Sequence, residues 1–285
     1  MPLLMDEVIE SDQIKKRSKI SAFVICLNEE RMIEDCIRSI QFCDEILLID
    51  SFSTDRTVEI AQSLGARVIQ REWPGFKEQK GFGLKSVEHE WVISLDADER
   101  VSPELKESII RVLEEDAAKG GIDEGMDQIN GYMINRVVYY LGRWWNKGGW
   151  YPEYRLRFFR RSKTEWGGVD PHEKPIVSGK ISKISGDIYH YTYRDIDDQF
   201  LRLHRYSTVS AKESFRKGKK PSLFAVFFNP ILRATKFLIF KKGYREGVPG
   251  LIVAIIEAYY TFMKYAKLWA YHYQAEHEKN DTKNT

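Results

Sequence analysis

The sequence predicts an α/β protein with a doubly wound, mixed sheet and a helical extension at its C-terminal end. Short apolar runs alternate with segments of helical periodicity over residues 20–103, which is typical of parallel strands joined by helices. Residues 129–140 and 155–160 alternate with a period of two, as antiparallel strands do. With 285 residues and 43% hydrophobic content, the chain is long enough to bury a sizeable core.

The first part is expected to fold as four β units connected by helices. The predicted strands are 20–27, 45–50, 66–70 and 91–96, and the helices are 29–40, one that ends at Gly65 and one that runs through Lys80. Ser53, Thr54 and Asp55 are candidate caps of the second helix. Ser102 and Pro103 begin a further helix, because Ser is a good cap and Pro is tolerated in the first turn.

Two acidic residues, Asp50 and Asp96, each end a predicted strand. Ligands of open parallel sheets bind outside the carboxyl ends of the strands, so we expect both carboxylates to face one site. The antiparallel second half is expected to supply the other side of that cleft. We divide the chain into an N-terminal extension (1–18), an α/β domain (19–195) and a basic helical extension (196–285).

The segment W-V-I-S-L-D-A-D-E-R, residues 91–100, is the most informative motif. Strand alternation places Asp96 and Asp98 on the same side of the chain. Two like charges so close repel each other, unless a hard divalent cation such as Mg²⁺ or Mn²⁺ lies between them and the phosphates of a ligand. The alternative is a strand-end turn with solvated acids.

The C-terminal third combines basic and apolar character. Residues 201–245 contain twelve Lys or Arg and one acid, Glu213. The apolar segments 223–240 and 248–263 are interrupted by charged residues and Pro230, so we expect helices that lie in the interface of an anionic membrane rather than helices that span it. Helices packed on the main domain are the alternative. The N-terminus lacks the pattern of a secretion signal, so we expect a cytoplasmic protein, peripheral on the inner face of the cell membrane and without a nucleic-acid partner.

The motifs together resemble glycosyltransferase family 2, nucleotide-sugar enzymes with the GT-A fold. The likeness rests on Asn28-Glu29-Glu30, the D-S-x-S-T-D loop at 50–55 and L-D-A-D-E at 95–99, and it covers about residues 20–103. Later segments are similar to the lipopolysaccharide core β-1,4-glucosyltransferase subgroup and extend the likeness to about residue 208. They are G-G-W-Y-P, R-L-R-F-F-R-R, His172-Glu173, G-D-I-Y-H-Y-T-Y-R-D and R-Y-S-T.

The resemblance implies specific roles for residues of the donor site. Asp50 would contact uracil, Glu29 with the backbone near Cys26 and Leu27 would enclose the nucleoside, Asp96 would lie by the ribose, Asp98 would bind the metal, and Lys80 would belong to the nucleotide site. The Asn that follows this lysine in the family pattern is Gly81 here. The subgroup pattern favours Glu173 as the catalytic base, with Asp170 in reserve.

Further candidates come from the residue types themselves. His190 could be another metal ligand, since a neutral imidazole suits Mn²⁺, although such a histidine is more often structural. Arg155 and Arg157 alternate on one strand face and are candidates to clamp a phosphate of the acceptor or donor, whereas Arg160 and Arg161 are expected to lie outside. The aromatic residues near residue 150 suggest sugar-stacking platforms, with core packing as an equal alternative. They are Trp144, Trp145, Trp150 and Tyr151.

The leading hypothesis is an inverting, metal-dependent glycosyltransferase that moves glucose or a similar hexose from a UDP-sugar to a lipid-linked glycan. Its cofactor would be Mg²⁺ or Mn²⁺, and its base would be a carboxylate that deprotonates the acceptor hydroxyl. The alternatives are an Asp-nucleophile phosphatase, which also carries Asp-x-Asp after an apolar strand, and a non-catalytic basic scaffold that binds membranes.

Overall fold

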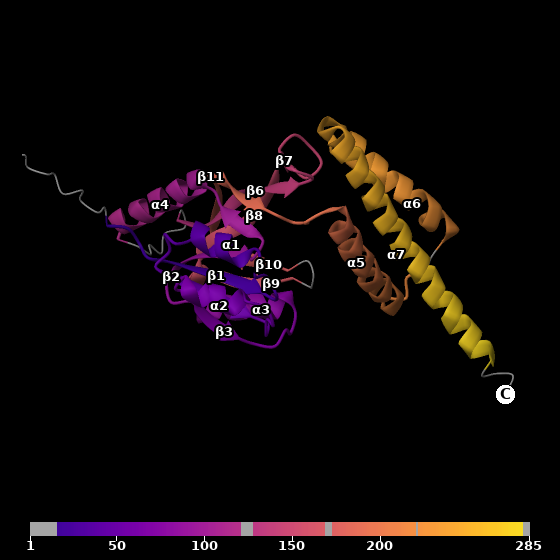
Figure 1. Cartoon of the computed structure of the whole chain (residues 1–285), viewed down its shortest axis with the longest axis horizontal. Helices are drawn as coiled ribbons and strands as arrows, with labels where there is room; N and C mark the ends of the chain where they lie inside the picture. The colour runs from indigo at the N-terminus through magenta and orange to yellow at the C-terminus, as the bar shows by residue number, and fades with distance from the viewer. Residues whose placement is uncertain (1–15, 121–127, 169–172, 221, 282–285) are drawn as a thin grey trace, which may run out of the picture. The chain divides into compact units, whose positions relative to one another are not determined.

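The computed structural model describes residues 16–120, 128–168, 173–220 and 222–281, the last four by their backbone alone (Figure 1). One sheet contains nine strands in the order β3-β2-β1-β4-β8-β6-β11-β5, with β7 paired to β6. The strands are β1 (Ile20–Cys26), β2 (Glu45–Asp50), β3 (Arg67–Gln70), β4 (Trp91–Asp96), β5 (Glu99–Val101), β6 (Ile129–Tyr140), β7 (Arg143–Trp145), β8 (Glu153–Arg160) and β11 (Lys180–His190). β9 (Thr164–Gly167) and β10 (Lys174–Val177) form a separate antiparallel pair.

Three helices connect the parallel strands β1 to β4: α1 (Ile33–Ser39), α2 (Thr57–Ser63) and α3 (Phe76–Ser86). A fourth, α4 (Pro103–Ala118), lies between β5 and β6. The remaining helices are α5 (Ile196–Arg216), α6 (Leu223–Thr235), the π-helical turn η2 (Lys236–Phe240), α7 (Val248–Asp281) and two short 3₁₀ turns, η1 (Arg161–Lys163) and η3 (Gly243–Glu246). The predicted α/β class, a doubly wound mixed sheet followed by a helical extension, is confirmed.

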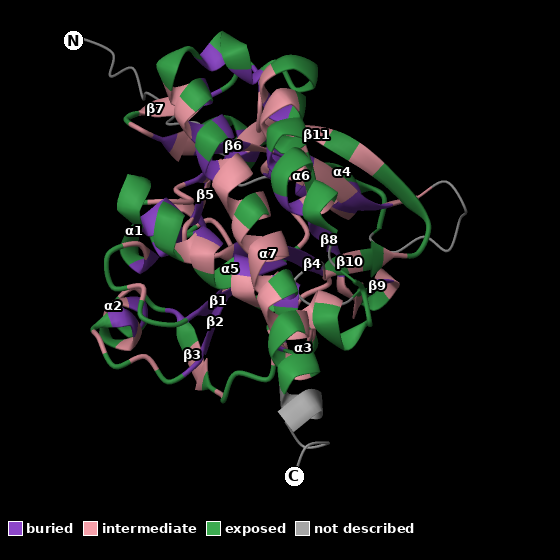
Figure 2. Ribbon diagram, turned by 90° about the vertical axis from the view of Figure 1, so that its right-hand side faces the viewer, coloured by how far each residue is buried: buried purple, intermediate pink, exposed green. Residues whose placement is uncertain are grey.

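Parallel pairing brings the carboxyl ends of the first strands together. β1 pairs in parallel with both β2 and β4, and the register sets Cys26 beside Asp50 and Ile25 beside Asp96. All seven residues of β1 are buried, as expected of a strand covered on both faces (Figure 2). The predicted gathering of Asp50 and Asp96 at one edge of the sheet therefore follows from the apolar strands that precede them.

The chain separates into two compact units that divide several strands between them. The first contains Met1–Ala97, Val101–Ile134 and Leu156–Gly186, and the second contains Asp98–Arg100, Asn135–Arg155 and Asp187–Thr285. The helices α5, α6 and α7 thus belong to the same unit as parts of β6, β8 and β11. The end of the α/β domain at residue 195 stays a prediction.

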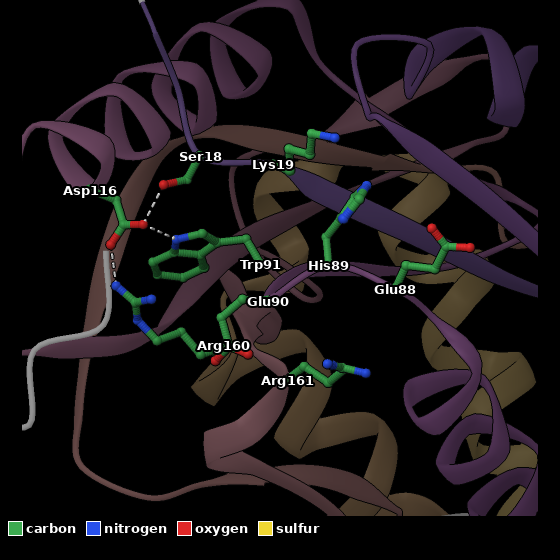
Figure 3. A pocket seen from close by; sticks show the side chains of 9 residues that line it. All are labelled: Ser18, Lys19, Glu88, His89, Glu90, Trp91, Asp116, Arg160 and Arg161. Atoms are coloured by element: carbon green, nitrogen blue, oxygen red, sulfur yellow. Dashed lines mark hydrogen bonds and ion pairs between the residues drawn. The ribbon is translucent and has the colours of Figure 1, made fainter. Parts of the chain in front are cut away.

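Arg160 is a correction to the sequence-based expectation that its side chain lies outside. It is 2% exposed, and its guanidinium forms an ion pair with Asp116 and lies 4.4 Å from the ring centroid of Trp91. Asp116 also accepts hydrogen bonds from the indole of Trp91 at 3.0 Å and from the hydroxyl of Ser18 at 2.6 Å. Figure 3 shows these groups beside a cavity of about 340 Å³ near the amino ends of β1 and β4. Pairing and stacking compensate the burial of this charge.

Replacing Asp116 with Ala is expected to lower the free energy of unfolding by about 3 kcal/mol, because a buried guanidinium loses its counter-ion. Urea unfolding followed by circular dichroism measures the change. Glu107→Ala, at an exposed position of the same helix, is the matched control and is expected to have little effect. Equal losses in the two variants would show that the ion pair does not stabilise the fold.

The second unit has its own aromatic core. Trp145 is fully buried and packs with Val138, Tyr140, Phe237 and Val253. Glu246, 1% exposed, accepts hydrogen bonds from the guanidinium of Arg143 at 2.7 Å and from the backbone N–H of Lys147 at 3.0 Å. The β6–β7 hairpin is thereby tied to the turn before α7, and α7 packs along both α5 and α6 (Figure 1).

Candidate functional site

Asp50 lies at the end of β2 and is fully buried. Its carboxylate accepts hydrogen bonds from the backbone N–H of Ser53 at 3.0 Å, from the Ser53 hydroxyl and from the side-chain amide of Gln70 at 3.0 Å. The thiol of Cys26 lies 3.5 Å from the same carboxylate, and burial, reinforced by the charge of Asp50, raises the pKa of that thiol. In this structure the carboxylate therefore organises the loop that follows β2.

The loops after β1 and β2 are joined by reciprocal hydrogen bonds. The backbone N–H of Asn28 donates to the Ser53 hydroxyl at 2.8 Å, and the side-chain oxygen of Asn28 accepts from the backbone N–H of Thr54 at 2.8 Å. The backbone N–H of Glu29 donates to the Thr57 hydroxyl at 2.8 Å. Ser53 and Thr54 were predicted to cap α2. Instead they bind the neighbouring loop, and α2 begins at Thr57 after Arg56.

Two apolar side chains stand exposed on these joined loops. Leu27 is 50% exposed and Phe52 is 52% exposed. Phe52 has a φ of 62° and Asn28 a φ of 55°, a region that a bulky residue seldom adopts. Strain of this kind persists where the surroundings over-determine it, often at ligand sites. Phe52 is the variable position of D-S-x-S-T-D, so the motif alone does not point to it.

Four charged side chains gather at the end of β4. The ammonium of Lys80, from α3, lies 2.9 Å from Asp96 Oδ1 and 3.3 Å from Glu173 Oε1. Arg157, from β8, donates to Asp96 Oδ2 at 2.6 Å. The side chains of Lys80, Glu173 and Arg157 are all less than a tenth exposed. Burial alone would raise the pKa of Asp96, but the Arg157 guanidinium and the Lys80 ammonium hold it well below its usual range.

This cluster changes how three of the predicted residues are understood. Lys80 is not a solvated helix lysine, and Glu173 pairs with it rather than with the adjacent Lys174. Arg157 lies beside Asp96 and pairs with its carboxylate, and its predicted role as a phosphate clamp stays a prediction. Sequence alone could not reveal the pairing, because Lys80 and Glu173 come from distant segments.

In the second unit, Asp98 lies in the turn between β4 and β5, and His190 ends β11. His190 Nε2 is 3.4 Å from Asp98 Oδ2, and the backbone N–H of Tyr191 donates to the carbonyl of Asp98 at 2.9 Å. The imidazole is mostly buried, and its Nδ1 has no hydrogen-bond partner among the described residues. The structure thus brings together the two predicted metal ligands.

Asp98 and His190 could supply part of the coordination shell of a divalent cation, with the substrate supplying further ligands. One carboxylate oxygen and one imidazole nitrogen converge, a pair that Mn²⁺ accepts. Within the described ranges no three His, Cys, Asp or Glu side chains form a group that could hold a metal by themselves. The other ligands would have to be phosphate oxygens and water, as is common for ions that bridge nucleotides.

Basic and aromatic groups accompany Asp98 within the second unit. Burial opposes the charge of Arg202, but Asp198 and the field of Asp98 together raise its pKa. The guanidinium of Arg100 lies 4.0 Å from the ring centroid of Tyr191. Neither arginine was a predicted site residue, and only its proximity in sequence to Asp98 could have pointed to Arg100.

The remaining predicted residues have varied environments. Arg155 is half exposed and pairs with Glu153. Trp145 belongs to the core and Trp150 packs against it, so for these two the core alternative is confirmed. Trp144 is half-buried, 4.6 Å from Tyr189 between ring centroids. Asp170, the reserve candidate for the base, lies outside the described residues.

A doubly wound sheet with acidic and basic side chains gathered at its strand ends is the arrangement expected of an α/β enzyme that binds its ligand at that edge. The family model described as glycosyl transferase family 2 matches residues 21–172, more than half of the chain, and the chain belongs to that family. The predicted resemblance is thus confirmed, and with it the general class of activity.

The relatives extend this similarity along the chain. A lipopolysaccharide core biosynthesis glycosyltransferase, LpsC, of Rhizobium meliloti is 31% identical over 261 residues, covering 89% of this chain and 93% of the relative. An uncharacterized glycosyltransferase of Rickettsia typhi is 29% identical, covering 88% and 86%. Among solved structures, glucosyl-3-phosphoglycerate synthase of Mycobacterium tuberculosis, in complex with Mn²⁺, UDP and glucosyl-3-phosphoglycerate, gives a TM-score of 0.32 and 29% identity over 44% of this chain and 45% of that chain.

Proposed function

We propose that this family 2 enzyme is an inverting, metal-dependent hexosyltransferase that uses a UDP-sugar, with glucose as the leading candidate, and a lipid-linked glycan such as lipopolysaccharide core. The observation that supports it best is the position of Glu173, whose carboxylate lies beside Lys80 in the cluster that contains Asp96. A base placed next to the donor side is what single-displacement transfer requires. The lipopolysaccharide relative supports the choice of acceptor.

In the proposed reaction the acceptor hydroxyl attacks the anomeric carbon of the donor. Glu173 takes the hydroxyl proton as the new C–O bond forms. The bond between the anomeric carbon and the diphosphate breaks, and its electron pair leaves on the diphosphate oxygen. One displacement inverts the configuration at the anomeric centre.

The residues at the ends of β1 and β2 are proposed to bind the nucleoside. Leu27 and Phe52 offer exposed apolar surface on which a base can stack. Asp50 would act mainly by holding Ser53 and its loop, since its carboxylate is fully buried. A direct contact between Asp50 and uracil would require one of its present hydrogen bonds to be exchanged.

Asp98 and His190 are proposed to hold Mg²⁺ or Mn²⁺ together with the donor diphosphate. When bound, the ion would neutralise charge that develops on the leaving diphosphate. Arg202, charged and close enough to be influenced by Asp98, is a further candidate to attract the diphosphate within the second unit.

The helical part of the second unit is proposed to bind an anionic membrane. Eight Leu, Ile and Phe side chains of α6 and η2 are more than half exposed, a larger apolar surface than soluble proteins usually leave uncovered. Lys219 and Lys220 precede this surface, and Lys241, Lys242 and Arg245 follow it. Residues 223–240 are long and apolar enough to cross a membrane, and only a sixth of this segment is buried, unlike the core helix of a soluble protein. Arg233 and Lys236 interrupt the segment, which favours an interfacial position over a span.

The donor side of the proposal is tested by measuring UDP binding with and without Mn²⁺. We expect Mn²⁺ to strengthen UDP binding at least about tenfold in the wild type and to have little effect in Asp98→Asn. Isothermal titration calorimetry gives the affinities, and a transfer assay with UDP-glucose and related donors gives the activity. Asp197→Asn, at an exposed position of α5, is the control. Undiminished Mn²⁺ dependence in Asp98→Asn would refute the assignment of this ligand.

The motif itself disfavours the phosphatase alternative. Such a motif continues with a hydroxyl residue, whereas Glu99 follows the second Asp here, and Glu99 is fully buried and pairs with Arg136 at 3.2 Å. Membership of glycosyltransferase family 2 likewise favours sugar transfer over phosphate hydrolysis.

A further inference from the structure

The ammonium of Lys80 is held in one place by four side chains. It lies 2.9 Å from Asp96 Oδ1 and 3.3 Å from Glu173 Oε1, and the ring centroids of Phe76 and Trp166 are 5.8 Å and 5.9 Å away. Its side chain is 6% exposed. A lysine so enclosed cannot sweep through solvent, as surface lysines do. Its charge is therefore fixed relative to both carboxylates.

The two carboxylates depend on Lys80 to different degrees. Asp96 receives a second cation, because Arg157 donates to its other oxygen at 2.6 Å. Glu173 receives Lys80 on Oε1 and is itself 9% exposed in its side chain. Within the described parts of the chain, Lys80 is the cation that the structure places on Glu173. Asp96 would thus remain paired without Lys80, whereas Glu173 would not.

We propose that Lys80 is a positioning residue for Glu173: it holds Oε1, which leaves Oε2 to receive the proton of the acceptor hydroxyl. This inference rests on the proposed function of Glu173 as the base. It differs from the family-based expectation for Lys80, a contact with the nucleotide, because the effect of Lys80 would reach the reaction through Glu173. The same ammonium also contacts Asp96, so Lys80 fixes the position of Glu173 relative to Asp96, which belongs to the proposed donor site.

The geometry also explains why a lysine suits this position. A compact ammonium can donate to two carboxylates from one point, whereas the planar guanidinium of arginine prefers a bidentate contact with one of them. Gly81 follows Lys80, and the Cβ of Trp166 lies 3.6 Å from the position that a Cβ on Gly81 would take. This is an ordinary van der Waals distance, so Gly81 packs against Trp166 without being sterically required there. Where the family pattern has Asn, this chain has Gly81, and the indole of Trp166 packs there beside the Lys80 ammonium.

A double-mutant cycle between Lys80 and Glu173 tests the inference. Lys80→Met removes the charge at similar length, and Glu173→Gln removes the base. In the Glu173 background we expect Lys80→Met to lower the turnover number at saturating UDP-sugar by about 100-fold, the size of a general-base contribution. In the Glu173→Gln background the same substitution should cost no more than about twofold, since residues that act as a unit are not additive.

Two further readouts separate positioning from donor binding. UDP affinity, measured by calorimetry, should change less than about threefold in Lys80→Met, and Lys80→Arg should recover at least about a tenth of the lost turnover. Lys85→Met, at an exposed position of the same helix, is the control. If Lys80→Met does not fold, Lys80→Gln replaces it in the cycle.

The outcomes are distinguishable. The role of Lys80 would be overturned if Lys80→Met lowered turnover by the same factor with and without Glu173→Gln. It would also be overturned if Lys80→Met lowered only the affinity for UDP. In both cases the enzyme would still be a UDP-sugar transferase. A wild type that transfers no sugar from any UDP donor would refute the proposed function, and the inference about Lys80 would fall with it. Full activity in Glu173→Gln would have the same consequence for the inference.

Discussion

Replacing Glu173 with Gln is expected to lower the turnover of sugar transfer by about 10³-fold while UDP binding stays within about threefold of the wild type. Glutamine has the same shape and can still accept a hydrogen bond from Lys80, but it cannot take a proton from the acceptor. Turnover is measured at saturating donor and acceptor, and binding by calorimetry. A loss of turnover without a loss of affinity is the signature of a group needed for the chemical step.

Glu165→Gln provides the matched control, because Glu165 is an exposed glutamate on β9, the strand paired with β10, which follows Glu173. It should transfer sugar at the wild-type rate. If Glu173→Gln kept wild-type turnover while Asp170→Asn lost it, Asp170 would be the base and the sequence-based choice between the two would be reversed.

Replacing Phe224, Phe227 and Ile231 with Ser should release the protein from anionic vesicles. These side chains are each about 60% exposed on α6, and burial of such a side chain in an apolar phase contributes about 1.5 to 3 kcal/mol. Because about 60% of each side chain is still available to be buried, the triple variant should bind vesicles at least about 100-fold more weakly. Cosedimentation with phosphatidylglycerol vesicles measures the change. Ile176→Ser, which removes a similarly exposed residue from β10, should bind as the wild type does.

Two further experiments test whether the basic residues contribute to membrane binding and whether residues 223–240 span the membrane. Lys217, Lys219 and Lys220 replaced by Glu should weaken binding to anionic vesicles more than to neutral ones, since each base near the surface contributes about 1 kcal/mol. Extraction at alkaline pH should release an interfacial protein and retain one whose 223–240 segment spans the membrane. If the triple Ser variant cosedimented like the wild type, membrane binding through α6 would be refuted.

The local elements were well predicted where short-range chemistry determines them. β2 has the predicted limits, and Ser102 accepts a hydrogen bond from the backbone N–H of Leu105 as the predicted cap of α4. By contrast, α7 continues to Asp281, well past the apolar segment that predicted it. Residues 264–273 still carry apolar and aromatic side chains, including the buried Leu268, but two lysines and a histidine separate them, and only the turns from Gln274 onward are mostly polar.

The candidate site shows the same division between local and long-range information. Asp50, Asp96 and Asp98 could be found because each follows an apolar strand, which is visible in the sequence. Lys80 and Arg157 were candidates as well, but their pairing with Asp96, and that of Gln70 with Asp50, could not be found, since these side chains meet only through the fold. Arg160 was predicted wrongly for a related reason. Alternation along a strand gives the side of the sheet, but it does not reveal a counter-ion such as Asp116.

The reciprocal hydrogen bonds between the loops after β1 and β2 have a consequence for the thermodynamics of donor binding. Asn28, Ser53 and Thr54 fix both loops before any ligand arrives, so their conformational entropy is lost on folding and not on association. A nucleoside would meet a surface already in its bound shape. Asn28 adopts its positive φ at little cost, whereas the positive φ of Phe52 is a strain that the folded protein carries.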